Sequence, residues 1–199
     1  MSAPPRGMVG AEIVRAIFGA YRLAHFDATG LAYFNNSVEG FWRSFIAAVL
    51  AAPAMAILIW IDWGLAAQAG QPLTHGLGHT VLVEALAYVI GWTALPLAMH
   101  AICEYAGWRD RYIGYIVALN WVSLFEIAIL LPVAAASVSG LLPEGLAVFV
   151  QIVVYGYFIG LEIFVARRAL AIGIPPAIAV VIFGIVLAVT VHQLANGFL

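Results

Sequence analysis

Long apolar runs dominate the distribution of hydrophobic and polar positions along this chain. Five stretches exceed the roughly 20 residues that a helix needs to cross a hydrocarbon core of about 30 Å: 41–63, 77–103, 112–136, 145–165 and 174–198. They are apolar on all sides rather than at alternate positions, which disfavours the strands of an outer-membrane barrel. A helix pairs its own backbone groups inside lipid. The pattern predicts an all-α, polytopic transmembrane bundle of five helices over residues 41–199.

The first forty residues have a different pattern, and we expect them to form a cytoplasmic amphipathic segment. Within residues 9–26, one helical stripe carries Glu12, Arg15, Gly19 and Arg22, and another is apolar: Ile13, Ile17, Tyr21 and Ala24, with Val14 and Phe18 beside them. Such a helix suits the headgroup layer, with its apolar face towards the lipid. The same face would also suit docking on the cytoplasmic ends of the bundle. Both interpretations stay open.

Turn and cap residues mark where the helices begin. Asp27 is suited to cap a short turn, and Asn36 with Glu39 resembles a capping box that opens the first transmembrane helix. Pro175 and Pro176 fall in the first turn of the last helix, where a missing N–H is harmless.

Composition supports a membrane protein and excludes other classes. The chain is 65% hydrophobic and 9% charged, with a mean hydropathy of +1.05, whereas soluble domains carry about 25% charged residues. Its one cysteine, Cys103, excludes an intramolecular disulfide bond. A net charge of −2 without a basic patch gives no sign of nucleic-acid binding.

The arginines predict the orientation. The chain has no lysine, and its arginines lie only in the N-terminal segment and in the loops after the second and fourth spans: positions 6, 15, 22, 43, 109, 111, 167 and 168. Short positively charged loops remain cytoplasmic. We therefore expect the N-terminus in the cytoplasm and the C-terminus on the outer side.

Polar side chains inside the predicted spans are the candidate site residues: Glu84, Asn120, Glu126, Gln151, Glu162 and His192. Intramembrane ionisable groups are often functional, so Glu84, Glu126 and His192 define one hypothesis, a small proton- or ion-coupled transporter. The other hypothesis is hydrogen bonding between helices, each bond worth about 0.6 kcal/mol. Transporters usually show paired broken helices in two repeats, which five helices without a visible repeat do not provide. We therefore favour the structural role.

Histidines raise the question of a metal or haem. His75 and His79, in "HGLGH", are one helical turn apart, which suits two ligands of one metal. A b-type haem subunit would instead pair His79 with His192, and it remains a third hypothesis. The motif lacks a zinc protease's glutamate and a third ligand, so the leading prediction has no metal and no cofactor.

Gly156 and Gly160 have GxxxG spacing, which allows close helix approach. This spacing predicts self-association through the fourth span.

The layout resembles the Yip-type (Rab-interacting) membrane proteins and their bacterial branch. The resemblance rests on "YAGWRDRYIGYIVALNW" (105–121) with its Gly114–Tyr115 pair, and on "FDATGLAYFNNSVEGFWRSF" (26–45) before the first span. Only Asp27 and Tyr33 correspond to that family's acidic-aromatic element. The resemblance implies a self-associating, non-enzymatic protein with five helices, located in the bacterial inner membrane.

The leading functional prediction is a non-catalytic scaffold or organiser of the membrane, or a subunit of a membrane complex. Its expected partners are the lipid bilayer and either a second copy of the chain or another membrane protein.

Overall fold

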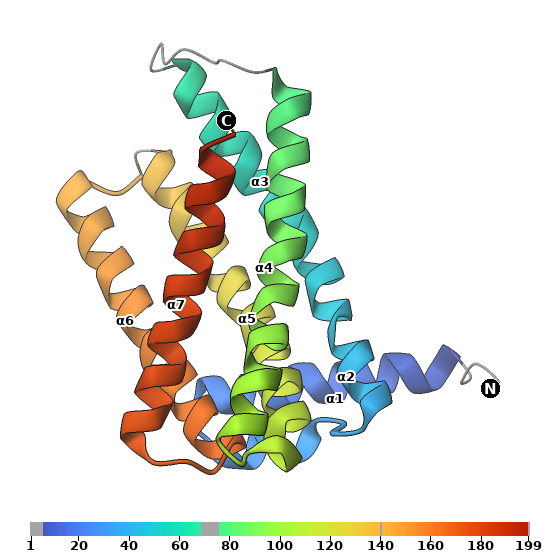
Figure 1. Ribbon diagram of the computed structural model, residues 1–199. Coiled ribbons are helices and arrows are strands. Elements are labelled where there is room, and N and C mark those ends of the chain that lie inside the picture. The colour runs from blue at the N-terminus through green and yellow to red at the C-terminus, as the bar shows by residue number, and fades with distance from the viewer. Residues whose placement is uncertain (1–5, 69–75, 140, 199) are drawn as a thin grey trace.

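The computed structural model describes residues 6–68, 76–139 and 141–198. Over these residues the chain is helical without strands and forms α1 (Arg6–Ala24), the 3₁₀ helix η1 (Ala28–Tyr33), α2 (Val38–Ser44), α3 (Ile46–Gln68), α4 (Leu77–Tyr105), α5 (Arg109–Val138), α6 (Glu144–Ala169) and α7 (Ile174–Asn196) (Figure 1). The predicted all-α class is confirmed.

Five helical segments in the described ranges are long and apolar enough to cross a membrane: Val38–Leu65, Leu77–Tyr105, Arg109–Ser137, Glu144–Ala169 and Ile174–Asn196. These segments coincide with the five predicted spans and indicate a multi-pass integral membrane protein. Several helices continue beyond the apolar stretch, as α6 does through Arg167 and Arg168 in its last turn. Basic residues in the last turn stabilise a helix, because they lie near the negative end of the helix dipole.

The beginning of the first span differs from the prediction. Residues 41–63 do not form one helix, because a turn at Phe45 separates α2 from α3. The cap also differs: Ser37, rather than Asn36, precedes α2, and its Oγ accepts a 3.0 Å hydrogen bond from the N–H of Gly40. Two predictions are confirmed, because Asp27 caps η1 and the prolines at 175 and 176 lie at the start of α7.

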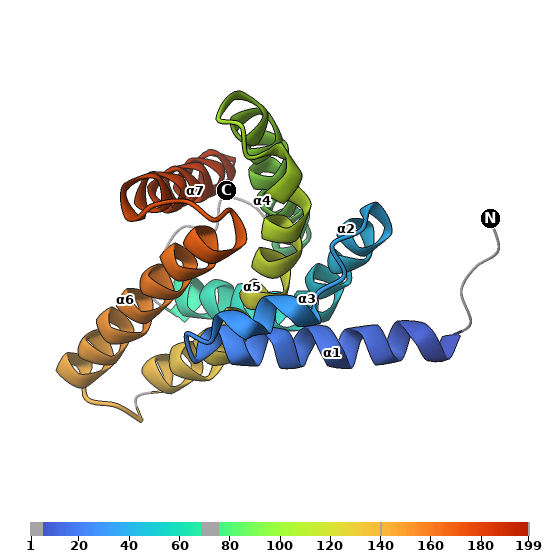
Figure 2. The same cartoon turned by 90° about the horizontal axis from the view of Figure 1, so that it is seen from below.

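Helix α5 is the centre of the fold. It packs against α1, α2, α3, α4 and α6, while α7 packs against α4 and α6. Every residue from Tyr115 to Val122 is buried. Seen from below in Figure 2, α1 runs across one end of the bundle, beside α5 and roughly perpendicular to the long helices. The N-terminal segment is therefore a docked helix at one end of the spans.

Candidate functional site

The docked helix α1 presents three different faces, which follow three residue stripes along it. The first stripe, Ala16, Ala20 and Leu23, is buried in the core that α1 shares with α5. The short side chains of Ala16 and Ala20 allow the backbones of α1 and α5 to approach closely. The docking face therefore combines these residues with Ile13 and Ala24 of the predicted stripe, which also pack in the core, whereas Ile17 and Tyr21 of that stripe are exposed.

The second face of α1 lies against η1. A Cβ placed on Gly19 would lie 2.9 Å from the carbonyl oxygen of Gly30, and one on Gly30 would lie 2.5 Å from the carbonyl oxygen of Gly19. These distances are shorter than van der Waals contact, so only glycine fits at both positions. The contact fixes η1 along the Arg15–Gly19–Arg22 stripe.

The third face of α1 is apolar and exposed, although at its edge the Phe18 ring lies 5.0 Å from the Tyr33 ring of η1. Val14, Ile17, Phe18 and Tyr21 are all exposed, Val14 by 67% and Tyr21 by 50%. Val14, Ile17 and Tyr21 follow helical spacing, on the side of α1 away from Gly19 and η1. The two interpretations of the amphipathic helix are therefore compatible: α1 docks with one face and leaves another free.

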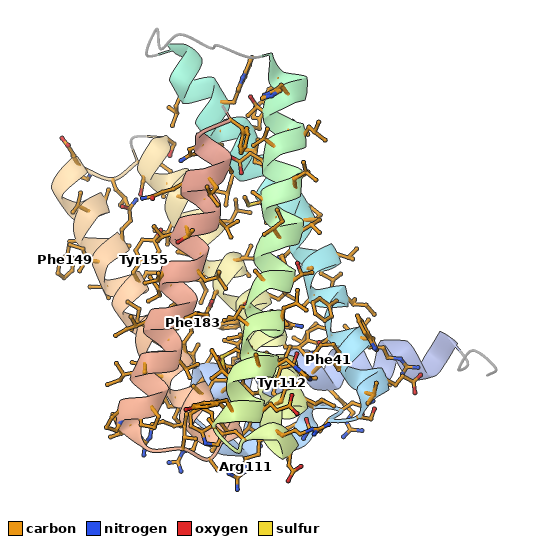
Figure 3. The ribbon with its side chains drawn as sticks, in the orientation of Figure 1. Phe41, Arg111, Tyr112, Phe149, Tyr155 and Phe183 are labelled. Carbon is orange, nitrogen blue, oxygen red and sulfur yellow. The ribbon has the colours of Figure 1, made fainter. Side chains whose placement is uncertain are left out.

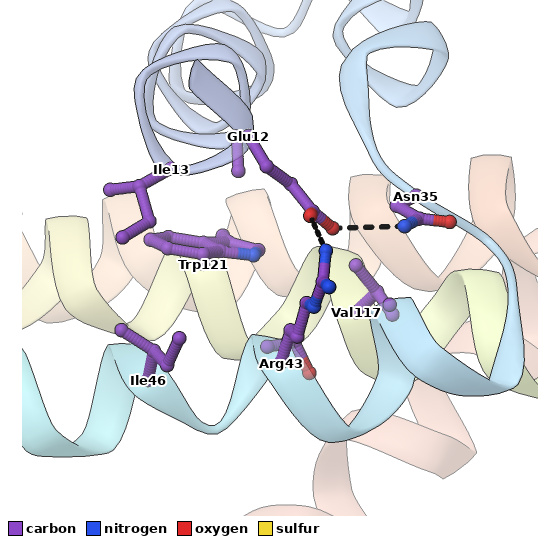
Figure 4. Close-up of a pocket in the computed structure, with 10 residues that line it drawn as sticks. Glu12, Ile13, Asn35, Arg43, Ile46, Val117 and Trp121 are labelled. Atoms are coloured by element: carbon purple, nitrogen blue, oxygen red, sulfur yellow. Dashed lines mark hydrogen bonds and ion pairs between the residues drawn. The ribbon is translucent and has the colours of Figure 1, made fainter. Parts of the chain in front are cut away.

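A small polar cluster fixes the N-terminal half of α1 to α2. Nη1 of Arg43 donates to Oε2 of Glu12 at 2.5 Å, and Nδ2 of Asn35 donates to Oε1 of Glu12 at 2.9 Å (Figure 4). Arg43 also contacts Glu39, with 2.5 Å between Nη2 and Oε1. Val117 and Trp121 of α5 line the same cavity, whose volume of about 10 Å³ suits a single water molecule.

The turn after α1 is stabilised by Asp27. Its carboxylate accepts hydrogen bonds from the hydroxyl and the backbone N–H of Thr29, and from Nε of Arg22 at 2.7 Å. The Thr29 hydroxyl, the Thr29 N–H and Arg22, in that order, lower the pKa of Asp27 to about 2. Hydrogen bonds to Asp27 and Tyr33 raise the pKa of Arg22. This end of the segment therefore keeps its ion pair at neutral pH.

The C-terminal end of α1 is tied to α6. The hydroxyl of Tyr157 donates to the carbonyl oxygen of Ala24. Phe26, with a φ of 58°, lies edge-on to Tyr157 and Phe164 at centroid distances of 5.9 and 5.4 Å. Three elements, α2, α5 and α6, therefore hold α1 across the end of the bundle.

Asn120, a predicted intramembrane candidate, has a structural partner. Its Nδ2 donates a 2.8 Å hydrogen bond to Oγ of Ser44, and both side chains are buried. Ser44 did not stand out in the sequence, since a serine near a helix end is common. The bond joins α5 to the end of α2. It is the kind of hydrogen bond between helices that the structural hypothesis for the intramembrane polar residues expects.

Glu126 and Glu162, also predicted candidates, lie on α5 and α6, which pack against each other. Oε1 of Glu126 is buried without a hydrogen-bond partner among the residues that the structure describes. Further along the same contact, Nε2 of Gln151 donates to Oγ of Ser137 at 3.4 Å. Three of the six candidates thus line one helix pair.

Glu84 and His192 lie on two other helices. Glu84 is half-buried on α4, which packs against both α5 and α7, and His192 is exposed on α7. The grouping of Glu84, Glu126 and His192 stays a prediction.

The remaining candidates are the histidines and the two glycines. His79 is exposed in the first turn of α4, and His75 lies outside the described residues. In the part of the chain that is described, no three His, Cys, Asp or Glu side chains gather as a metal site requires. Gly156 and Gly160 have nothing within 4 Å of an added Cβ, so their stripe contacts no other helix of this chain.

Comparison of the chain with protein-family models, with curated proteins and with solved structures gave no match. The functional argument therefore depends on the residues of this chain alone.

Proposed function

We propose that this protein is a non-catalytic scaffold of the membrane that organises or shapes the bilayer through α1. The observation that carries the proposal is the exposed apolar face of Val14, Ile17, Phe18 and Tyr21 on a helix that lies across the spans. An amphipathic helix in this position buries its apolar face at the boundary between headgroups and acyl chains. It occupies area in one leaflet only, and such asymmetry bends or orders a membrane.

The arginines support a cytoplasmic position for α1. The ends of α2, α5 and α6 that carry Arg43, Arg109, Arg111, Arg167 and Arg168 lie at the same end of the bundle as α1. Positive charge favours the cytoplasmic side and its anionic lipids. The proposal places the N-terminus inside, the C-terminus outside, and the protein in a bacterial inner membrane.

The proposal is of the kind that the resemblance to Yip-type proteins implies. That resemblance rests on an amphipathic N-terminal segment followed by five spans, and it implies a non-enzymatic, self-associating protein. The open stripe of Gly156 and Gly160 offers a surface for a second copy of the chain.

One observation favours a second candidate, a proton- or ion-coupled carrier. Intramembrane carboxyl groups often form relays, and Glu126 and Glu162 lie on α5 and α6, which pack against each other. This candidate would use Glu162 as the partner of Glu126, instead of Glu84 and His192. The scaffold is preferred because α1 has a specific free surface, whereas the carboxyl pair has no accompanying helix break of the kind found in transporters.

The position of α1 can be measured with nitroxide labels. Ile17→Cys and Arg15→Cys are labelled separately in a Cys103→Ala background and reconstituted in vesicles. We expect the label at position 17 to be accessible to oxygen and shielded from a water-soluble nickel complex, and the label at position 15 to show the opposite. Equal exposure of both labels to nickel would contradict insertion of α1.

The consequence for the membrane is tested with matched substitutions on the same helix. Wild-type protein should narrow or tubulate vesicles viewed by electron cryomicroscopy. The double variant Ile17→Ser, Tyr21→Ser should insert normally and leave vesicles round, while Arg15→Ser, on the polar face, should behave as wild type. Shaping that persists in the double variant would refute the scaffold role of α1.

A further inference from the structure

A groove at the α1 end of the bundle is used by none of the features above. It lies between α2, α4 and α5, has a volume of about 340 Å³, and is lined by Phe41, Trp42, His100, Arg109, Tyr112 and Ile113, among others. Ligand pockets begin at about 300 Å³, so the groove has room for part of a small amphiphilic molecule.

The walls of the groove are aromatic and fixed. Phe41 and Tyr112 lie side by side with ring centroids 5.9 Å apart (Figure 3). The Tyr112 hydroxyl donates a 3.0 Å hydrogen bond to the carbonyl oxygen of Pro96. His100 stands perpendicular to the Tyr112 ring at 5.4 Å. Trp42, by contrast, is 68% exposed, so one side of the groove is open.

The rim of the groove is cationic. Arg109 is the first residue of α5, and its side chain is 77% exposed. Its ion pair with Glu104 has a length of 3.3 Å, and both partners are exposed. Exposed pairs of this kind contribute little, so the guanidinium group is free to exchange Glu104 for a stronger anion. The exposed ring of His100 offers a second hydrogen-bonding group.

We propose that this groove binds one anionic phospholipid of the leaflet that surrounds α1. The lipid phosphate would contact Arg109 and His100, and an acyl chain would run along Phe41, Trp42 and Ile113. The charge and the apolar walls together match this amphiphile: a soluble anion would leave the aromatic surface uncovered, and a zwitterionic lipid would bring a cation of its own next to Arg109. The inference rests on the proposed function in one respect, the location of the α1 end at the membrane boundary.

Native mass spectrometry of the protein in mild detergent tests the proposal. The protein is incubated with equal amounts of phosphatidylglycerol and phosphatidylcholine of the same acyl composition, and separately with inorganic phosphate. We expect one phosphatidylglycerol to be retained, at least about fivefold over phosphatidylcholine, because the choline cation of phosphatidylcholine is repelled by Arg109, a difference of about 1 kcal/mol. Inorganic phosphate alone should not be retained.

Three variants locate the bound lipid. Arg109→Gln should bring the ratio of the two lipids close to 1, and Trp42→Ala should lower the retention of both. Arg15→Gln removes the same charge from exposed α1, outside the groove, and should keep the wild-type ratio.

Three results would overturn the proposal. These are equal retention of both lipids by the wild type, equal losses in Arg109→Gln and Arg15→Gln, and a dimer that Trp42→Ala dissociates, which would make the groove a protein interface. None of the three depends on the free face of α1. Vesicle shaping can therefore fail while lipid retention succeeds, and the reverse.

Discussion

Glu12 of α1 forms an ion pair with Arg43 of α2, with 2.5 Å between Oε2 and Nη1. Arg43 makes a second pair of equal length with Glu39. The two pairs differ in their surroundings: the side chain of Glu12 is 23% exposed and that of Glu39 is 64% exposed. Arg43 therefore forms one ion pair with a sheltered carboxylate and one with a solvated carboxylate, so the two pairs can be compared within the same structure.

Glu12→Gln should weaken the docking of α1 more than Glu39→Gln. Hydrogen bonds to charged groups contribute about 1.5–3 kcal/mol when sheltered, whereas exposed pairs along a helix contribute about 0.3–0.5 kcal/mol. We expect Glu12→Gln to lower the free energy of unfolding by about 1–2 kcal/mol and to speed amide exchange in α1. Equal effects of the two variants would show that Glu12 does not hold the helix.

The bond between Asn120 and Ser44 should be measurable as a coupling. In a double-mutant cycle with Asn120→Ala and Ser44→Ala, we expect a coupling energy of about 0.6–1.7 kcal/mol, the range known for hydrogen bonds between membrane helices. Pairing Asn120→Ala with Thr93→Ala serves as the control, because the Thr93 hydroxyl bonds only to its own helix. A cycle for Asn120 and Ser44 as additive as this control would contradict the role assigned to the bond.

The spans were predictable because lipid imposes a local requirement. A helix surrounded by acyl chains must be apolar on every side, whatever its neighbours are, and this property is visible in the sequence. The ends were less predictable, since helix α6 continues to Ala169 beyond the predicted residue 165. The last turn of α6 carries two arginines. A span predicted from hydropathy ends before such charged residues, whereas the helix itself continues through them because they interact favourably with its C-terminal dipole.

The docking face of α1 was only partly predictable from its hydrophobic stripe. Ile13 and Ala24 of that stripe pack in the core, whereas Ile17 and Tyr21 are exposed. The rest of the docking face lies outside the stripe and consists of Ala16, Ala20 and Leu23. Small residues allow close approach only where a partner backbone is present, and a sequence does not reveal which helix lies opposite. The same limit holds for the neighbours of Glu126, since α5 packs against both α4 and α6.

Two glycines of similar appearance in the sequence should respond oppositely to alanine. A Cβ on Gly40 would lie 2.0 Å from the carbonyl oxygen of Asn35, whereas a Cβ on Gly156 would meet nothing. We expect Gly40→Ala to destabilise the fold by about 1–3 kcal/mol, as overpacking does. Gly156→Ala should be neutral or stabilise by up to about 1 kcal/mol through helix propensity.

Thermal unfolding in detergent separates the two glycine variants. In the same preparations, Gly156→Leu reports on self-association, because its side chain would disturb only a second copy of the chain. Destabilisation by Gly156→Ala would show that this stripe packs within the monomer.

Acid should loosen the turn between α1 and η1. The folded pKa of Asp27 is about 2, below its ordinary value of 3.8. A lowered pKa means that the contribution of Asp27 is complete above pH 3.8 and is lost as the pH falls towards 2. The protection of the Thr29 and Gly30 amides, measured from their exchange rate relative to the intrinsic rate at each pH, should therefore fall over this interval in the wild type. Asp27→Asn should show no such change with pH. Exchange that is already fast at pH 6 would contradict the cap.

The carboxyl pair decides between the scaffold and the carrier. Glutamine has the shape of glutamate and keeps an acceptor oxygen, so Glu126→Gln should preserve the contact between α5 and α6 while removing the ionisable group. For a scaffold we expect a change in unfolding free energy of less than about 1 kcal/mol, the scale of one such polar contact, and unaltered vesicle shaping. Proteoliposomes containing a pH-sensitive dye should show no protein-dependent proton flux.

Glu84→Gln is the matched control for the carboxyl pair, since Glu84 lies on α4, outside the contact between α5 and α6. If the wild type dissipates a pH gradient, and Glu126→Gln and Glu162→Gln abolish this flux while Glu84→Gln retains it, the carrier replaces the scaffold as the function of the bundle. A flux lost equally in all three variants would point to a damaged fold, which their unfolding curves would reveal. A membrane that stays tight in every case counts against the carrier, and it leaves the exposed apolar face of α1 as the surface on which the proposed function depends.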